Sequence, residues 1–322
     1  MSADRLTTTS PHELTASVLA VLAGADLRTT AANNALDPAD LDEAVDIYQA
    51  AGFAALQRHT EHGWYQVRVE FPDWSIAETA GASRLGPRLD QLQAAGEVGG
   101  WWFLRKHPCW RLRLHGADVA AVDHALDDLV EAGVITRWWP TVYEPETAAF
   151  GGTAGMDAAH DLFCADTRGV LDYARHDAPG LGRRELSILL LSGLLRSAEL
   201  DVFESGDVFD RVARLRPAPT DADTTRIDRL VADLRILLAI PELPTSWLFT
   251  SGGPVAHAAP WLTAFQTAGR QLGGAAAQGR LDRGLRALLT HVVIFHWNRF
   301  GLSAASQGIL ARAAAAALLP RS

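Results

Sequence analysis

The chain has 322 residues, a formal net charge of −9 and only two cysteines. The acidity argues against a broad nucleic-acid-binding surface, and two cysteines exclude a disulfide framework. No apolar run of about 18 residues is free of charge, and residues 1–11 lack the basic and apolar regions of a secretory signal, so we expect a cytoplasmic protein that does not enter the membrane.

The first 60 residues predict a small helical appendage. Three helices are expected in residues 12–58, the third beginning at the cap signal of Asp37. The outline resembles a helix–turn–helix, but Asp40 and Glu43 stand where a DNA-reading helix needs positive or amide side chains. We therefore expect no direct DNA binding; residues 1–60 either dock a partner protein or a leader peptide, or simply pack.

Residues 61–322 predict an α+β domain that begins with a sheet layer. Apolar and polar residues alternate in residues 64–71, as in a half-buried strand. Further strands are expected at residues 100–105, 110–114 and 135–143, with helices at 84–95 and 117–132 between them. This order of elements favours an antiparallel or mixed sheet with helices packed on it.

The chain after residue 155 predicts a mainly helical C-terminal half. Helices are expected at residues 156–174, 183–200, 225–239, 260–272 and 281–299, and the alanine run at 313–317 continues a final helix. Loops rich in proline or glycine are expected near residues 217–220, 241–244 and 251–254.

The segment 99–116, GGWWFLRKHPCWRLRLHG, is the first candidate for chemistry. Arg111 and Arg113 are two residues apart on an expected strand, so they point to one face, while Trp110 and its alternate neighbours point to the other. Two guanidinium groups on one side of a strand form an anion site. A solvent-exposed strand face is the competing interpretation.

The segment 143–152, YEPETAAFGG, is the second candidate. Glu144 and Glu146 are expected on one face of a strand end, just before a Gly-Gly turn. Such carboxylates either hold the two arginines in bidentate pairs or serve as acid and base.

The segment 290–301, THVVIFHWNRFG, is the third candidate and lies near the end of an expected helix. His296 and Arg299 share a helical face with Val292 and Val293, whereas Asn298 projects elsewhere. A histidine on an apolar helix is compatible with a hydrogen-bonded core residue as well as with a catalyst.

Together these segments resemble the C-terminal domain of class I lantibiotic dehydratases and its stand-alone relatives. An aromatic strand ending in a basic residue, an R-x-R strand, Y-x-x-E before G-G, and H-x-N-R-x-G follow one another from residue 64 to the end. The resemblance implies an α+β lyase that removes glutamate from glutamylated serine or threonine of a ribosomal precursor peptide, leaving dehydroalanine or dehydrobutyrine. It also implies a separate subunit that performs the glutamylation.

The resemblance carries over to single residues. Arg111 and Arg113 match the R-x-R arginines, Glu146 matches the acidic residue before the glycine pair, and His296 matches the histidine before N-R; these four are the expected catalytic residues. The expected substrate-binding residues are Arg105, Arg299, Asn298 and Glu144. No metal or cofactor is expected, because the histidines are scattered and the glycine pairs lack a phosphate-binding context.

Two positions depart from the family pattern. Trp110 replaces the usual histidine before R-x-R, and Ala149 replaces a basic residue before the aromatic-Gly-Gly sequence. Arg105 or Arg299 is the expected substitute for the missing cation. The departures leave two alternatives open: a pyridine synthase, which joins two dehydroalanines in a formal [4+2] cycloaddition and releases the leader, and a non-catalytic adaptor that binds a leader peptide or a dehydratase.

Overall fold

The computed structural model describes residues 11–219, 224–240 and 245–319, and the chain forms two compact units, Met1–Gly63 and Trp64–Ser322. Residues 1–10, the expected loop at 241–244 and the last residue of the loop at 217–220 lie outside the described ranges. No described helix combines the length and the apolar character that crossing a membrane requires.

The first unit consists of the three expected helices, α1 (Pro11–Leu22), α2 (Leu27–Asn33) and α3 (Pro38–His62). The carboxylate of Asp37 accepts a hydrogen bond from the Ala39 backbone and caps α3, as the sequence predicts. The unit has a small core of its own, made of Val18, Ala31, Leu41 and Val45.

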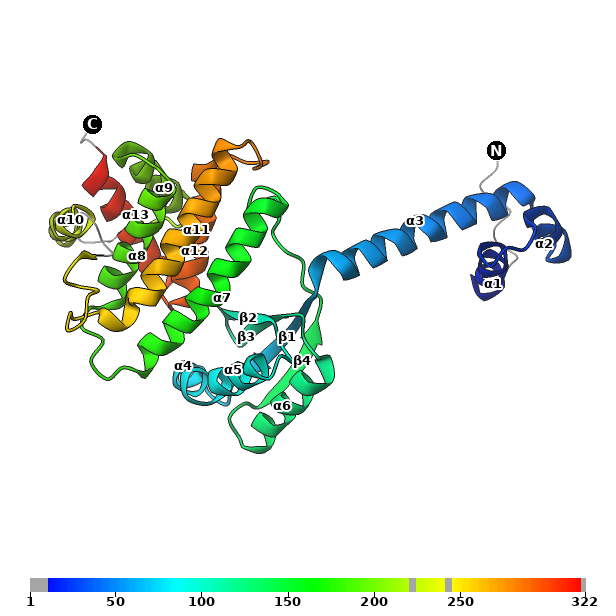
Figure 1. The fold of residues 1–322 in the computed structure, drawn as a ribbon, viewed down its shortest axis with the longest axis horizontal. Coiled ribbons are helices and arrows are strands. Elements are labelled where there is room, and N and C mark those ends of the chain that lie inside the picture. Colours follow the sequence, from blue (N-terminus) through cyan, green and yellow to red (C-terminus); the bar gives the residue numbers. More distant parts are fainter. Residues whose placement is uncertain (1–10, 220–223, 241–244, 320–322) are drawn as a thin grey trace. The chain divides into compact units, whose positions relative to one another are not determined.

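The second unit begins with a four-stranded antiparallel sheet of order β2-β3-β1-β4. The strands are β1 (Trp64–Glu70), β2 (Gly100–Lys106), β3 (Cys109–His115) and β4 (Arg137–Thr141). The helices between them are α4 (Ala77–Ala80), the π-helical turn Gly81–Leu85, α5 (Gly86–Ala94) and α6 (Val119–Glu131). Figure 1 shows α4, α5 and α6 close together beside the sheet, and α4 and the π-helical turn also contact the later helix at residues 153–175.

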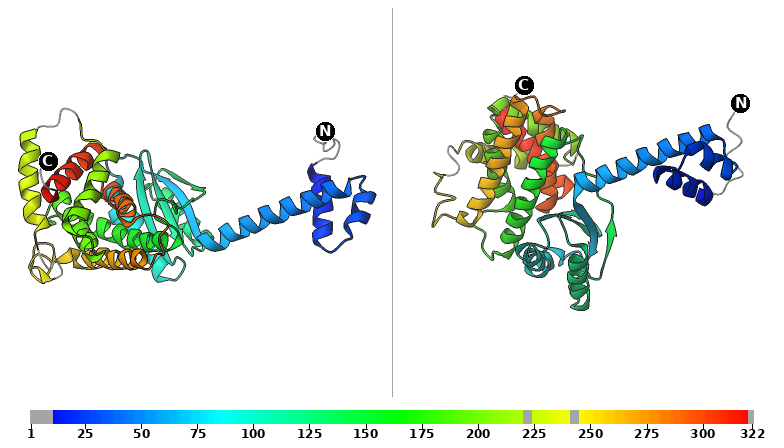
Figure 2. Two further views of the ribbon diagram at one scale, coloured as in Figure 1. Left: turned by 90° about the horizontal axis from the view of Figure 1, so that it is seen from above. Right: turned by 45° about the vertical axis from the view of Figure 1, so that its right-hand side comes forward.

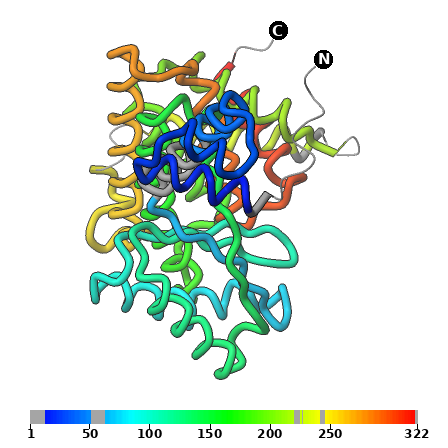
Figure 3. The backbone as a smooth tube through the Cα atoms, turned by 90° about the vertical axis from the view of Figure 1, so that its right-hand side faces the viewer, coloured from blue at the N-terminus to red at the C-terminus, as the bar shows by residue number. Residues whose placement is uncertain are grey.

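The rest of the second unit is helical and confirms the α+β prediction of a sheet layer followed by helices. It contains α7 (Thr153–Arg175), α8 (Arg183–Ser197), α9 (Val202–Leu215), α10 (Thr224–Leu238), α11 (Ala259–Ala277), α12 (Leu285–Arg299) and α13 (Ala304–Leu318). These helices gather on one side of the sheet, with α10 remote from it (Figures 1, 2 and 3). Helix α9 was not expected, although Asp201 and Glu204 form a capping box at its start.

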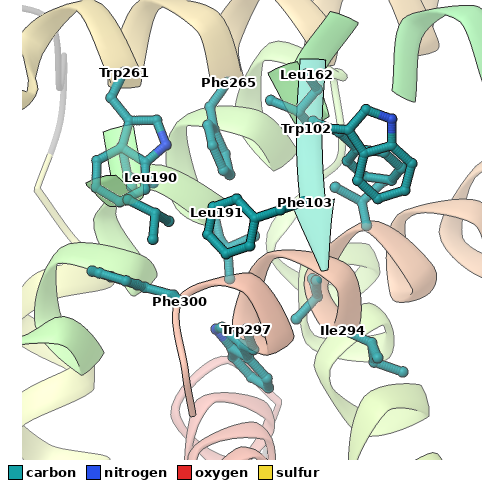
Figure 4. Close-up of a cluster of buried hydrophobic side chains, with 14 of the residues drawn as sticks. Trp102, Phe103, Leu162, Leu190, Leu191, Trp261, Phe265, Ile294, Trp297 and Phe300 are labelled. Atoms are coloured by element: carbon teal, nitrogen blue, oxygen red, sulfur yellow. The ribbon is translucent and has the colours of Figure 1, made fainter. Parts of the chain in front are cut away.

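Strand β2 joins the two halves because it is the edge strand that packs against α7 and α12. Trp102 and Phe103 are neighbours on β2, so their side chains project to opposite sides of the strand. Figure 4 shows both of them among side chains of the helical half. The backbone N–H of Phe103 donates to Oγ1 of Thr167 on α7, 3.3 Å away. This junction positions the candidate site.

Candidate functional site

Arg113 lies in a buried aromatic setting on strand β3. Its side chain is 3% exposed, and its Cζ atom lies 4.2 Å from the ring centroid of Trp102 and 4.6 Å from that of Tyr143. Its Nε donates to Oε1 of Gln66 on strand β1, 2.8 Å away. The interpretation as a solvent-exposed strand face is therefore wrong for Arg113.

Arg299 reaches the same indole from the end of helix α12. It is fully buried, and its Cζ lies 5.4 Å from the ring centroid of Trp102 and 4.7 Å from that of Phe163. Its Nη1 donates to Oδ2 of Asp166 on α7, and its Nε donates to the carbonyl oxygen of Phe103, 3.0 Å away. Helix α7 and strand β2 thus fix the guanidinium in place.

Three buried N–H donors at this indole have no hydrogen-bond acceptor among the described residues. They are Nη1 of Arg113, Nη2 of Arg299 and Nε1 of Trp102, which we call the donor cluster. A buried donor without an acceptor costs about 1–3 kcal/mol, and more when it is charged. Two guanidinium groups and an indole N–H in this state are a donor set suited to an anion such as a carboxylate.

The charges around the donor cluster do not cancel. Burial lowers the pKa of Arg113 to about 10, which leaves it charged at neutral pH. Burial also lowers the pKa of Arg299, while the charge of Asp166 opposes that effect. Burial would raise the pKa of Asp166, but the charges of His296 and Arg299 outweigh it and hold that pKa below its usual range. The two arginines and one carboxylate therefore carry an excess positive charge, which favours an anionic ligand.

His296 contacts Asp166 rather than the donor cluster. Its Nδ1 lies 2.9 Å from Oδ1 of Asp166, and its Nε2 lies 3.0 Å from Oγ of Ser187 on α8. The ring is fully buried among aromatic side chains, including Trp261 and Phe265, which Figure 4 shows together in this core. His296 and Arg299 therefore contact the same buried carboxylate.

A second set of charges fixes the end of helix α12. Glu78 on α4 accepts hydrogen bonds from Arg105 (2.5 Å) and from both terminal nitrogens of Arg183 (2.9 and 2.6 Å). Arg105 Nε also donates to the carbonyl of Arg299, and Arg183 Nη1 donates to that of Phe300, each over 2.8 Å. Cations at the last carbonyls of a helix stabilise its C-terminus. We call Glu78, Arg105 and Arg183 the clamp.

The glycine pair of the second segment forms the turn that starts helix α7. Gly151 and Gly152 have φ angles of +75° and +89°, which side chains other than glycine rarely adopt. A Cβ at Gly152 would also meet the carboxylate of Asp282. The pair thus has a backbone role that does not depend on ligand binding.

Residues 64–318 match a family model described as the C-terminal part of the lantibiotic biosynthesis dehydratase. The chain belongs to this family. The resemblance inferred from the three sequence segments is thereby confirmed. No curated protein matches the chain.

Solved structures share the fold of this dehydratase C-terminal domain. The tRNA dependent lantibiotic dehydratase MibB from Microbispora sp. 107891 is 16% identical with a TM-score of 0.58, over 79% of this chain and 28% of MibB. The pyridine synthase TbtD from thiomuracin biosynthesis is 12% identical with a TM-score of 0.58, over 80% of this chain and 98% of TbtD. TsrL is 18% identical with a TM-score of 0.53, over 80% of this chain and 99% of TsrL. The chain therefore spans less than a third of the length of MibB.

The dehydratase C-terminal domain brings some of the expected arginines together and separates others. Arg113 and Arg299 meet at Trp102, whereas Arg105 belongs to the clamp. Arg111 is half-buried and lies two residues before Arg113 on strand β3, where it is paired with Arg68 of strand β1. Of the two candidates for the missing cation at position 149, Arg299 is the one with a fully buried guanidinium nitrogen that has no acceptor among the described residues.

Glu144, Glu146 and Asn298 lie around the site without joining the donor cluster. Strand β4 ends at Thr141, so the two glutamates follow the strand instead of sharing a face of it, because the chain already leaves the sheet there. Both are exposed and form no ion pair with a described arginine, although the charge of Glu146 raises the pKa of Arg113 against the effect of burial. Asn298 accepts a hydrogen bond from Gln307, 2.9 Å away.

Asp166 and His160 are site residues that the sequence analysis missed. Both lie on the buried side of helix α7, where Phe163 and Val170 mark the apolar stripe. An ionisable residue within an apolar stripe is expected to have a partner, and this signal was present in the sequence. The hydrogen-bond partners of these two residues are set by tertiary packing, and no local sequence pattern predicts them.

Proposed function

We propose that the chain eliminates glutamate from glutamylated serine or threonine residues of a ribosomal precursor peptide, forming dehydroalanine or dehydrobutyrine. The proposal rests on family membership together with one observation, the donor cluster of Arg113, Arg299 and Trp102. Elimination from such an ester releases a carboxylate, and three buried donors without acceptors suit that leaving group.

In this proposal the arginines stabilise the negative charge that develops during the reaction. Removal of the Cα proton generates enolate-like charge, and cleavage of the Cβ–O bond transfers charge to the departing glutamate carboxylate. Preorganised donors in a buried site stabilise such charge more strongly than water does, because they need no reorganisation. Arg113 and Arg299 have this role, and Arg111 and Glu146 border the site next to Arg113.

His296 enters the proposal as a positioning residue. Its motif position led us to expect a substrate base, but the ring is buried and both of its nitrogens contact protein atoms. Its contact with Asp166 orients the carboxylate that holds Arg299. Asn298 and Arg105 act in the same indirect way, through the end of helix α12.

The proposed partners are a precursor peptide with its leader and a separate subunit that supplies the glutamyl ester. The chain spans 28% of the length of MibB, and the family resemblance implies such a subunit for a split dehydratase. We propose that the reaction takes place in the cytoplasm, where ribosomal precursors are made, and that residues 1–60 dock the leader or the partner subunit.

The test is mass spectrometry of a chemically glutamylated precursor peptide incubated with the purified protein. The proposal expects loss of one glutamic acid for each modified residue, and no change in an otherwise identical peptide that already contains dehydroalanine. Arg137→Gln is a matched control, because Arg137 is exposed on strand β4, where it forms an ion pair with Glu70 and lies over the ring of Trp139. It should react like the wild type, whereas Arg113→Gln should not.

The same assay separates the two alternatives. A pyridine synthase is favoured by the fold match over 98% of TbtD and by Ala149 in place of the basic residue. It would leave the glutamylated peptide unchanged, close a ring in the dehydroalanine peptide and release its leader. An adaptor would leave both peptides unchanged while still binding the leader.

A further inference from the structure

Tyr143 and His160 form a buried pair that the proposed function does not yet use. Tyr143 Oη and His160 Nε2 lie 2.8 Å apart, and the two side chains are 7% and 8% exposed. The sequence neighbours of Tyr143, Val142 and Glu144, are exposed. Tyr143 therefore points inward from a surface segment and meets His160 of helix α7 just beneath the surface.

The pair lies against the donor cluster. The guanidinium of Arg113 lies 4.6 Å from the centroid of the Tyr143 ring. The indole of Trp102 lies 6.0 Å from the Tyr143 ring and 6.3 Å from the His160 ring, measured between centroids. A substrate whose carboxylate is held by the cluster therefore lies beside the phenol.

The surroundings of Tyr143 keep its hydroxyl protonated at rest. Burial raises the pKa of Tyr143, and the charge of Arg113 lowers it by less than burial raises it. A phenol in this state can pass its own proton to a neighbouring imidazole while it receives another. Such a pair can remove a proton without forming a free phenolate.

We propose that Tyr143 and His160 are the acid–base pair of the elimination, with Tyr143 contacting the substrate and His160 receiving the proton. The inference rests on the proposed function and names the base that the donor cluster itself lacks.

The step conserves atoms and charge. The Cα–H bond of the glutamylated residue breaks, its proton passes to Tyr143 Oη, and the phenolic proton passes to His160 Nε2. The electron pair left on Cα forms the Cα=Cβ bond, and the Cβ–O bond breaks with its electron pair remaining on the departing glutamate carboxylate. Arg113 and Arg299 bind that carboxylate. His160 then returns the proton to the carboxylate or to water.

Two other groups near the site suit this role less well. Glu146 is exposed to solvent, so water competes for its carboxylate and weakens it as a base. His296 contacts Asp166, which in turn binds Arg299 of the donor cluster, and both of its ring nitrogens contact protein atoms. Glu146 is accessible, however, and the experiment therefore includes it as the competing base.

The experiment compares four variants of the full chain on a glutamylated peptide that carries either hydrogen or deuterium at Cα. Tyr143→Phe keeps the ring contacts and removes the hydroxyl, and His160→Gln keeps a hydrogen-bond partner that takes up no proton. Glu146→Gln tests the competing base. Tyr65→Phe is the matched control, because it removes the hydroxyl of a partly buried tyrosine that donates to Asp123, away from the site.

We expect Tyr143→Phe and His160→Gln each to lower kcat by at least about 100-fold, the usual contribution of a positioned acid–base group. KM and the affinity for free L-glutamate should stay within about 3-fold of wild type, because the donor cluster is intact. The deuterium isotope effect on kcat should increase, because removal of the Cα proton becomes slower. A purely structural role would lower the folded fraction and leave the isotope effect unchanged.

The outcomes separate this inference from the proposed function. If the wild type eliminates glutamate and Tyr143→Phe retains its kcat, or if Glu146→Gln alone abolishes turnover, the acid–base pair is overturned and the proposed function stands. If the wild type leaves the glutamylated peptide unchanged, both are overturned. Loss of kcat in both pair variants, with the larger isotope effect and an unaffected Tyr65→Phe, supports the inference.

Discussion

Asp166 holds one side of the Arg299 guanidinium and leaves the other side unpaired. Arg299 Nη1 donates to Asp166 Oδ2, whereas Nη2 has no acceptor among the described residues. The same carboxylate also accepts a hydrogen bond from Trp261 Nε1 (2.9 Å) and contacts His296. One buried acid thus orients the cation that the proposal assigns to the leaving group.

Asp166→Asn should therefore destabilise the fold. Loss of one partner of a buried ion pair costs about 3–5 kcal/mol, because the other charge remains buried without compensation. Urea denaturation measures this free energy of unfolding. Asp157→Asn is the matched control, since Asp157 is an exposed acid on the same helix. A loss of less than about 1 kcal/mol would show that the pair does not hold Arg299 in place.

Arg113→Lys should lower kcat/KM for the glutamylated peptide by at least about 100-fold, the usual cost of removing one preorganised donor. An ammonium group cannot donate to Gln66 and at the same time present the parallel N–H groups that bind a carboxylate. Steady-state kinetics checks this, with Arg137→Lys on the exposed strand β4 as the control. Wild-type rates in Arg113→Lys would mean that the arginine is only structural.

His296→Ala should abolish elimination, as its motif position predicts, and it should also destabilise the fold. The substitution removes the ring that contacts Asp166 and Ser187 and leaves a cavity in a fully buried aromatic region, although Asp166 keeps Arg299 and Ser187 keeps Trp297 as partners. We expect a loss of about 2–4 kcal/mol in unfolding free energy together with the loss of turnover. A variant that unfolds like the wild type and yet has no activity would restore the role of substrate base.

The clamp should make stability depend on pH through Glu78. Burial raises the pKa of Glu78, but hydrogen bonds and charges from Arg183 and Arg105 outweigh it and lower the pKa below its ordinary value of 4.5. A depressed carboxyl pKa contributes stability that is complete above that ordinary value and is lost as pH falls through the folded-state pKa. Glu78→Gln should therefore cost about 2 kcal/mol at pH 7, and the cost should shrink progressively as pH falls below 4.5. Thermal unfolding across pH checks this, and a deficit that does not change with pH would contradict it.

Local patterns in the sequence predicted most of the fold. The alternation in β1 and the helical periodicity after residue 155 located elements whose bounds differ from the structure by a few residues. The expected extension of β4 to residue 143 was wrong, because Tyr143 turns into the core and leaves the sheet. Helix α9 was missed although both its capping box and its apolar stripe of Val208, Phe209 and Val212 were visible in the sequence.

The candidate site could be predicted only in part, because it depends on contacts between distant positions. The R-x-R pattern located Arg113, and the C-terminal segment located Arg299. Nothing local shows that both meet at Trp102, or that Asp166 lies between Arg299 and His296. The sequence therefore indicated a catalytic role for His296 but not the buried contacts with Asp166 and Ser187 that packing gives it.

Removal of residues 1–63 tests whether the first unit serves catalysis or docking. Its core of Val18, Ala31, Leu41 and Val45 is separate from the core of the second unit, so the chain beginning at Trp64 should fold with an unchanged thermal midpoint. Turnover of a leaderless glutamylated peptide should be unaffected. If residues 1–60 dock the leader, KM for the full precursor should rise by at least about 10-fold, equivalent to about 1.4 kcal/mol of lost binding. An equal KM for both forms of the protein would exclude leader docking, and loss of turnover on the leaderless peptide would show that the first unit contributes to the catalytic domain.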